Sequence, residues 1–189
     1  MEKGKIRIIG GKWKGKKIPF SIDPKLRPTP DRAKEMVFNW LGNDLSGLSC
    51  LDLFAGTGAM GIEALSRGAI KIDFVETEKN FAHNLQSTLK SLKENTNTKV
   101  YNEDFHKWFN QIKSGQIYDL IFIDPPFNKD LIADVFDCLK QKKVYSKETV
   151  FYLESETNIN LNFLDDEFEI FKEKIMKKKC YRLLKIKTT

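Results

Sequence analysis

The chain has 189 residues, of which 41% are hydrophobic and 31% charged, so it has enough apolar surface for a folded core and wholesale disorder is excluded. This length favours one domain, or one domain with a small extension. No apolar run approaches the ~20 residues that span a bilayer, and the charged N-terminus lacks the apolar segment of a signal peptide. We therefore expect a cytoplasmic protein that has no membrane partner.

The cysteines agree with that compartment. Cys50, Cys138 and Cys180 are odd in number and far apart, so they fit neither a disulfide framework nor the ligand spacing of a zinc site. They suit a reducing cytosol, and we expect no metal.

The net charge of +6 is concentrated at one end of the chain. Residues 1–34 hold 11 basic and 3 acidic side chains, whereas the remainder holds 21 and 23. A basic end is typical of a surface that binds a polyanion such as RNA. Isoleucine, tryptophan and phenylalanine alternate with these lysines, which favours a folded element over the alternative, a solvated and frayed terminus.

Residues 7–9 and 17–20 flank three glycines, a pattern that predicts a small β-hairpin with a cationic polar face. We expect residues 1–24 to form this RNA-contacting extension and residues 25–189 to form the main domain. A helix is predicted next, with Thr29 as its N-cap and Pro30 at its first position. Its buried face is expected to consist of Ala33, Met36, Val37, Trp40 and Leu41, and Gly42 ends it.

From residue 50 onward, predicted strands alternate with predicted helices, which indicates a doubly wound α/β sheet. The strands are expected at residues 50–54, 70–75, 99–102, 120–123 and 150–153, with an antiparallel pair at 167–171 and 181–186. The uninterrupted apolar run at 120–123 is typical of a central parallel strand covered on both faces.

A complete G-x-G-x-x-G pattern stands between the first of these strands and its helix, at Gly56, Gly58 and Gly61. Glu76 follows Gly56 by 20 residues, at the end of the next strand. By pattern alone this is a dinucleotide fingerprint, with the acid on a ribose hydroxyl. It predicts a cofactor that contains adenosine.

Asp52 distinguishes between such cofactors. A pyrophosphate beside it would face an unpaired carboxylate, whereas S-adenosylmethionine brings an ammonium and a sulfonium that a carboxylate favours. We therefore favour S-adenosylmethionine over a nicotinamide cofactor, although Asp52 could also bind backbone N–H groups of its own turn. An oxidoreductase also lacks an obvious proton relay, since His83 and His106 lie in helical patterns and are expected to be structural or exposed.

Asp104 and Phe105 follow the strand at 99–102. The carboxylate could accept a hydrogen bond from the adenine amino group, with the phenyl ring packed beside the base. Alternatively, Asp104 is only the N-cap of the next helix, and the two roles are compatible.

The tetrapeptide Asp124-Pro125-Pro126-Phe127 directly follows the strand at 120–123, at the edge where open α/β sheets bind ligands. The lone pair of an exocyclic base amine is delocalised into the ring, so methylation requires that it be freed. The carboxylate of Asp124 and the carbonyl of Pro125 could hold the two N–H bonds, and Asp124 could take the released proton. Phe127 offers a flat face for an extruded base; the alternative is a turn that merely ends a strand.

These motifs, in this order, resemble class I S-adenosylmethionine-dependent methyltransferases that modify exocyclic amines. The segments RIIGGKWKGKKIPF and LRPTPDRAKEMVFNWL narrow the resemblance to the RsmD family of 16S rRNA guanine-N2 methyltransferases, over about residues 6–155. The resemblance implies a Rossmann-like, seven-stranded and mostly parallel sheet with helices on both faces and a reversed last hairpin. It also implies methylation of one guanine of 16S rRNA, in the small ribosomal subunit or a late assembly intermediate.

Carried over by position, the resemblance assigns the guanine to Asp124, Pro125 and Phe127 and the cofactor to the ends of the first strands. The expected cofactor contacts are Thr29, Asp52, Phe54, Gly56, Gly58, Glu76, Thr77, Asp104 and Phe105. The expected RNA contacts are Arg7, Lys12, Lys14, Lys16, Lys17, Arg27 and Arg32. One departure is Arg182, which follows Tyr181 where the family tends to have glycine; it puts in question the last strand and any RNA contact from residues 177–179.

Two further alternatives remain besides the oxidoreductase. An N6-adenine DNA or RNA methyltransferase would use the same acceptors, but so short a chain leaves little room for a separate base-reading domain. A non-catalytic rRNA-binding assembly factor would keep the fold and lose the cofactor acids, all of which are present. Nothing demands a dimer, and we expect a monomer.

Overall fold

The computed structural model describes residues 3–21, 29–93, 97–113, 115–126, 131–164 and 167–187. The strands are β1 (Lys3–Arg7), β2 (Lys17–Ser21), β3 (Ser49–Asp52), β4 (Lys71–Val75), β5 (Asn97–Tyr101), β6 (Tyr118–Ile123), β7 (Tyr145–Glu156), β8 (Phe168–Met176) and β9 (Lys179–Ile186). The helices are α1 (Asp31–Leu41), α2 (Ala59–Ser66), α3 (Lys79–Ser91), α4 (Phe105–Gln111) and α5 (Leu131–Lys142), with 3-10 turns at Gly11–Trp13 and Asn162–Leu164.

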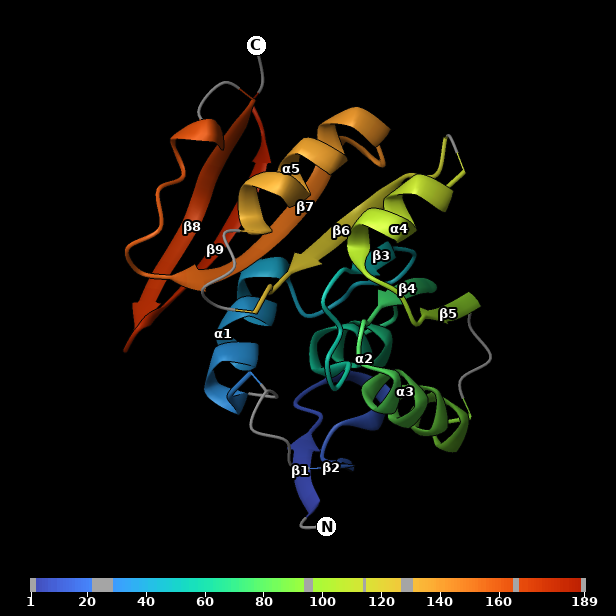
Figure 1. Cartoon of the computed structure of the whole chain (residues 1–189). Helices are drawn as coiled ribbons and strands as arrows, with labels where there is room; N and C mark the ends of the chain where they lie inside the picture. Colours follow the sequence, from blue (N-terminus) through green and yellow to red (C-terminus); the bar gives the residue numbers. More distant parts are fainter. Residues whose placement is uncertain are drawn as a thin grey trace.

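Seven strands form one sheet in the order β5-β4-β3-β6-β7-β9-β8 (Figure 1). Neighbours from β5 to β7 are parallel, and β9 is antiparallel to both β7 and β8. The prediction of a mostly parallel seven-stranded sheet with a reversed last hairpin is therefore confirmed. The chain order turns between β3 and β6, so the carboxyl ends of these two strands form the crevice where such sheets bind ligands.

The predicted strand ends differ most in the last three strands. β7 begins at Tyr145 and β8 extends to Met176, both beyond the predicted ranges. In β8 the pairing with β9 shifts register between Ile170 and Lys172, and most of the strand beyond Phe168 is exposed. An exposed, bulged edge strand loses the alternation of apolar and polar residues that identifies a strand in sequence.

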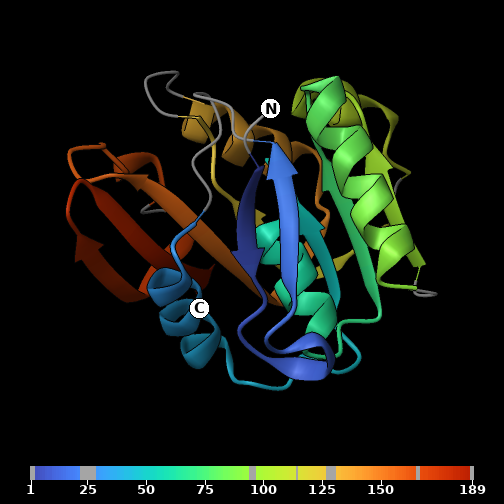
Figure 2. The same ribbon diagram turned by 90° about the horizontal axis from the view of Figure 1, so that it is seen from below.

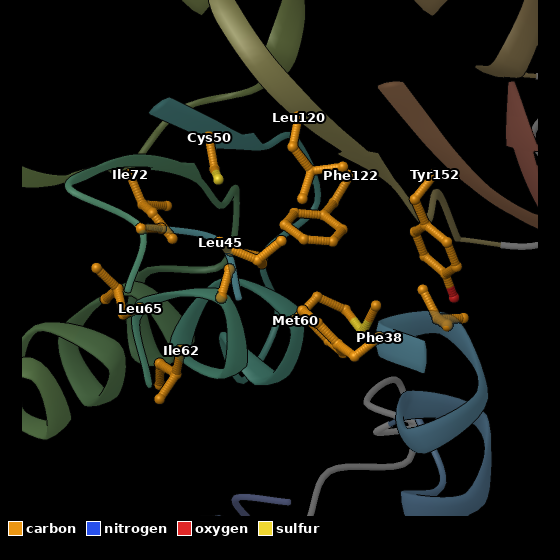
Figure 3. Packing of buried hydrophobic residues seen from close by; sticks show 14 of the residues in the cluster. Phe38, Leu45, Cys50, Met60, Ile62, Leu65, Ile72, Leu120, Phe122 and Tyr152 are labelled. Atoms are coloured by element: carbon orange, nitrogen blue, oxygen red, sulfur yellow. The ribbon is translucent and has the colours of Figure 1, made fainter. Parts of the chain in front are cut away.

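Helices cover both faces of the sheet, and each face has its own core. Figure 3 shows the first core, in which Phe38 of α1 and Met60 and Ile62 of α2 lie under strand residues such as Phe122 and Tyr152. The second core joins α4 and α5 to the opposite face; its helical residues are Phe105, Trp108, Phe109, Ile132, Val135, Phe136 and Leu139. In the described part of the chain, no helix is both long and apolar enough to cross a membrane.

The start of α1 and its buried face differ from the prediction. Pro30 occupies the N-cap position without a side-chain cap, and Thr29 is buried just before it. The fully buried residues are Ala33, Lys34, Val37 and Phe38, while Met36, Trp40 and Leu41 are only half-buried. The helix is rotated relative to the prediction for two reasons. The ring of Phe38 packs against that of Phe122, with their centroids 6.2 Å apart, and Lys34 has buried polar partners. The periodicity of the sequence reveals neither contact.

The two N-terminal strands form the predicted hairpin, although its first strand is β1 (Lys3–Arg7) and not residues 7–9. Arg7 pairs with Lys17, so residues 8–16 form the connection. Ile6, Ile8 and Ile18 point into the core, and Lys5, Arg7 and Lys17 are exposed, as the cationic face predicts. Figure 2 shows the hairpin across α2, between α1 and α3. The expected boundary between residues 24 and 25 lies outside the described residues.

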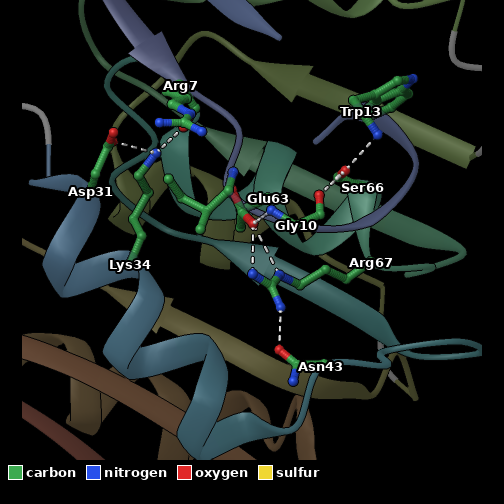
Figure 4. Close-up of polar contacts among 10 residues, drawn as sticks. Arg7, Gly10, Trp13, Asp31, Lys34, Asn43, Glu63, Ser66 and Arg67 are labelled. Carbon is green, nitrogen blue, oxygen red and sulfur yellow. Dashed lines mark hydrogen bonds and ion pairs between the residues drawn. The ribbon is translucent and has the colours of Figure 1, made fainter. Parts of the chain in front are cut away.

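Buried polar contacts fasten the connection of the hairpin to the last turn of α2 (Figure 4). The Glu63 carboxylate accepts from the backbone N–H groups of Ile9 and Gly10 at 2.8 and 2.7 Å, and it pairs with Arg67 at 2.9 Å. Ser66 Oγ donates to the Gly10 carbonyl and accepts from the Trp13 N–H. These contacts account for residues 9 and 10 leaving the strand, because their N–H groups bind α2.

The same contacts determine two neighbouring positions. Gly11 has a φ of +72°, and a Cβ there would overlap the carbonyl oxygen of Ser66, so only glycine fits. The Lys34 ammonium, fully buried in α1, donates to the Arg7 carbonyl and pairs with Asp31 at 3.3 Å. Lys34 therefore anchors the hairpin and does not belong to its exposed basic surface.

Candidate active site

Acidic residues stand where three neighbouring strands end. Asp52 is the last residue of β3, Glu76 follows β4, and Asp124 follows β6. Because parallel strands end at one edge, the structure brings these carboxylates to the crevice that the strand order creates.

Each glycine of the G-x-G-x-x-G pattern has a distinct structural reason. Gly56 and Gly58 have φ values of +53° and +75°, which form the turn before α2. A Cβ on Gly58 would overlap Leu85 of α3, and one on Gly61 would overlap the ring of Phe74 in β4. The glycines thus allow the turn and the close packing of α2, as the pattern predicts.

Glu76 is buried and holds this turn in place. Its two carboxylate oxygens accept from the N–H groups of Gly56 and Glu78, each at 2.7 Å. Burial raises the pKa of Glu76 above its usual range. Sequence reasoning missed Asn102, whose side-chain N–H₂ donates to the carbonyls of Glu76 and Thr77 at 2.9 and 3.0 Å. Its position directly after β5 was the only available signal.

Asp52 is 4% exposed, and its Oδ2 accepts from the N–H of Gly61 at 3.2 Å. Burial, with a smaller effect from Glu76, raises the pKa of Asp52 to about 7. The alternative that Asp52 binds backbone of its own turn and helix is thus confirmed. No lysine or arginine of the described chain forms an ion pair with it, so its charge is uncompensated.

Asp124 follows the most buried strand and is itself only partly exposed. Burial and the neighbouring carboxylate of Glu154 raise the pKa of Asp124 well above its usual range, and the ammonium of Lys179 partly opposes this. Pro125 is buried and Pro126 is exposed. Phe127, expected to stack on the base, lies outside the described residues.

Two phenyl rings from different parts of the sequence meet beside this crevice. Phe54 follows β3, Phe105 begins α4, and their ring centroids are 5.5 Å apart. Asp104 accepts from the N–H of Lys107 at 3.0 Å, so it is the N-cap of α4, as the simpler alternative predicted. Its second carboxylate oxygen lies 4.0 Å from the Lys107 ammonium.

The expected RNA-binding residues in the described chain are on the surface. Arg7, Lys12, Lys14, Lys16, Lys17 and Arg32 are all exposed, and Arg27 lies outside the described residues. The hairpin therefore presents most of these cations on a folded scaffold that is fastened to α2.

The departure at Arg182 does not disturb the last strand. Arg182 pairs in register with Leu153 of β7 and Glu173 of β8. Its nearly buried guanidinium donates to Glu173 at 2.6 Å and to Ser155 Oγ at 2.7 Å. Polar neighbours on both adjacent strands thus accommodate a large cation where a glycine was expected.

Comparisons with known proteins agree with this geometry. A family model described as "Conserved hypothetical protein 95" matches residues 6–185. The "Ribosomal RNA small subunit methyltransferase D" of Escherichia coli is 37% identical over 180 residues, which cover 95% of this chain and 89% of that protein. The protein of the same name from Haemophilus influenzae is 36% identical, over 96% of this chain and 94% of that protein. The chain belongs to the RsmD family.

A solved structure with a similar sequence confirms the fold. "Putative methyltransferase yhhF from Escherichia coli" has a TM-score of 0.87 and 33% sequence identity, over 97% of this chain and 98% of that chain. Membership of the RsmD family confirms the prediction of an S-adenosylmethionine-dependent rRNA methyltransferase.

The residues at the carboxyl edge fit S-adenosylmethionine. Asp52 is a buried carboxylate without a cationic partner in the described chain, which suits a ligand that carries positive charge. Phe54 and Phe105 offer an apolar wall for a flat ring. The described residues would hold the cofactor between the glycine turn and this wall.

Proposed function

We propose that this RsmD family member transfers a methyl group from S-adenosylmethionine to the exocyclic N2 of one guanine in 16S rRNA, and that it acts as a monomer on the small subunit or a late assembly intermediate. The observation that carries this proposal is the juxtaposition of Asp124-Pro125 with the acidic glycine turn, at the carboxyl ends of adjacent strands β6 and β3. S-adenosylmethionine supplies a methyl group activated by a positively charged sulfonium.

On the cofactor side, the proposed roles follow from charge and shape. Asp52 favours the positive charges, and Glu76 and Thr77 lie where a ribose would be held. Asp104, Phe54 and Phe105 would surround the adenine, and Thr29, buried just before α1, would also contact the cofactor. Glu76 keeps capacity for this role, since its Oε2 has a second lone pair beyond the Gly56 N–H that it accepts.

On the substrate side, the Asp124 carboxylate and the Pro125 carbonyl would accept hydrogen bonds from the two N–H groups of the guanine amine. The nitrogen then becomes pyramidal, and its lone pair leaves conjugation with the ring and can attack the methyl group. The raised pKa of Asp124 makes it a competent acceptor for the proton that N2 loses as the new C–N bond forms. The burial of Pro125 restricts the loop that holds these acceptors.

The basic hairpin would position the RNA. Its exposed lysines suit phosphate contacts, which orient a nucleic acid without reading its bases. Arg32, exposed at the start of α1, extends this surface toward the carboxyl edge. Arg27 and Phe127 keep their expected roles in RNA and base contact within the proposal.

The test is methyl transfer to small subunits from a strain that lacks the modification, followed by mass mapping of the modified nucleotide. We expect one methyl group on guanine N2 and a decrease of about 10³-fold in kcat for Asp124→Ala, the size typical of a lost proton acceptor. S-adenosylmethionine should still bind to Asp124→Ala within a few-fold, by calorimetry.

Glu148→Ala is the matched control, since this exposed carboxylate lies at the opposite end of the sheet, near the start of β7, and should leave turnover unchanged. Methylation of adenine N6 would contradict the guanine assignment. Full turnover by Asp124→Ala would remove Asp124 from the chemistry, and light scattering would test the monomer.

A further inference from the structure

A second carboxylate lies beside Asp124 on the neighbouring strand. Ile123, the last residue of β6, pairs with Leu153 of β7 on parallel strands about 4.8 Å apart, so Asp124, directly after β6, lies beside Glu154, the next residue of β7. Two residues earlier, Phe122 and Tyr152 belong to one core cluster. Because side chains alternate along a strand, Asp124 and Glu154 face the same side of the sheet.

Glu154 is fully buried, and its contacts show that it has a defined electrostatic environment. The hydroxyl of Tyr152 donates to Glu154 Oε2 at 2.8 Å. The ammonium of Lys179, which reaches over from β9, forms an ion pair with Glu154 Oε1. Lys179 compensates the charge of this buried carboxylate, and its own side chain is still 21% exposed to solvent.

We propose that Glu154 and Lys179 are positioning residues that act through Asp124 and set the pH range over which Asp124 can accept a proton from the substrate amine. This inference rests on the proposed function of Asp124. Neither residue needs to touch the substrate.

Opposing charges explain how the pair would act. The Glu154 carboxylate disfavours a second negative charge at Asp124, and the Lys179 ammonium favours it. Without Lys179, Asp124 would be protonated over a wider pH range and could not take the proton of the amine there. Without Glu154, Asp124 would be a weaker proton acceptor. The pair therefore balances ionisation against basicity at one carboxylate.

The other groups around Asp124 affect its ionisation less than Glu154 and Lys179 do. Asp52 of β3 adds a smaller repulsion. Tyr152 and Tyr181 stay neutral, because burial and the nearby carboxylates raise the pKa of both phenols. Helix α1 contributes apolar residues such as Phe38 to the core cluster of Tyr152, and the buried ammonium of Lys34 in this helix is paired with Asp31 and the Arg7 carbonyl.

The decisive experiment is a ¹³C NMR titration of the Asp124 carboxyl group in the cofactor-free protein. In Glu154→Gln, which keeps an oxygen for Tyr152, we expect the titration midpoint of Asp124 to fall by about one pH unit. In Lys179→Met we expect it to rise by a similar amount. Opposite shifts from two neighbours are an electrostatic signature that a loss of packing does not produce.

The matched controls are Glu169→Gln and Lys185→Met, which remove an exposed ion pair between β8 and β9, whereas Glu154 and Lys179 join β7 to β9. Neither should move the midpoint. If Lys179→Met fails to fold, Glu154→Gln alone decides: an unchanged midpoint in Glu154→Gln overturns the inference.

The pH profile of kcat provides the second readout. Its acid limb should shift in the same direction as the NMR midpoint in each variant, while the KM for rRNA stays constant. A shifted midpoint together with an unshifted acid limb overturns the inference. Shifted midpoints in a protein that never methylates RNA would instead contradict the proposed function, so the two failures are distinguishable.

Discussion

The buried carboxylates at the two ends of helix α2 differ in whether they have a cationic partner. At its last turn, Glu63 is matched by Arg67 and by two backbone N–H groups of the hairpin connection. At its first turn, Asp52 accepts from the N–H of Gly61 and has no ion pair in the described chain. Both carboxylates are almost fully buried, so the difference lies in compensation and not in exposure.

This difference separates a structural site from a binding site. A compensated charge stabilises the fold and needs nothing else, whereas an uncompensated buried charge is favourable only once a ligand of opposite sign arrives. We therefore expect substitutions at the two ends to have opposite effects on stability.

The largest effect is expected at the compensated end. Glu63→Ala leaves the Arg67 guanidinium and the N–H groups of Ile9 and Gly10 without their acceptor, and should lower the free energy of unfolding by about 3–5 kcal/mol. Urea unfolding measures it. Glu35→Ala, at an exposed position of α1, is the control. A loss below about 1 kcal/mol would show that the hairpin is not held by Glu63.

At the uncompensated end, Asp52→Asn should stabilise the cofactor-free protein by about 1–3 kcal/mol at pH 8. The pKa of Asp52 is raised from its usual range to about 7, so the folded state binds more protons than the unfolded state between about pH 4 and pH 7. Stability attributable to this group is therefore present at low pH and lost as the pH rises through 7.

Thermal unfolding of both proteins at pH 5 and pH 8 checks this sign, because the gain should be clearly smaller at pH 5 than at pH 8. Asparagine keeps an acceptor for the Gly61 N–H, so the fold should persist. S-adenosylmethionine binding, by contrast, should weaken at least tenfold. An Asp52→Asn protein that is less stable at pH 8 would refute the view of an uncompensated charge.

The smallest effect is expected for the hairpin surface, which tests whether its cations serve RNA or structure. Replacing Lys12, Lys14, Lys16 and Lys17 together with glutamine should weaken rRNA binding about tenfold. The slope of log affinity against log salt concentration should decrease by about 2–3, because about that many phosphate contacts are lost. Filter binding across salt concentrations measures both, and cofactor affinity should be unchanged.

The same number of charges can be removed on another surface as a control. Lys107, Lys113, Lys142 and Lys143 are exposed near α4 and α5. Their replacement should leave the salt dependence almost intact. Loss of cofactor binding in the hairpin variant would show that the hairpin lysines are structural.

The elements that local pattern determines were predictable. The apolar run of β6, the glycine turn and the N-cap at Asp104 each depend on a few consecutive residues, and the structure has all of them. The acids at the carboxyl edge were predictable from the sequence because each lies near the end of a predicted strand.

The features that were missed depend on partners distant in sequence. The burial of Lys34 requires the Arg7 carbonyl, and the early end of β1 requires the acceptor at Glu63. Glu154 directly follows the predicted strand at 150–153, and only the pairing of β6 with β7 places it beside Asp124. Periodicity cannot report contacts that the tertiary fold creates.

The bond from Glu76 to the Gly56 N–H has a consequence for ligand affinity. The loop that would meet the cofactor is already fixed to its neighbouring strand, so binding need not order a flexible segment first. Conformational entropy that a loose loop would lose on association is lost during folding instead, and preorganisation of this kind lets a few contacts yield tight binding.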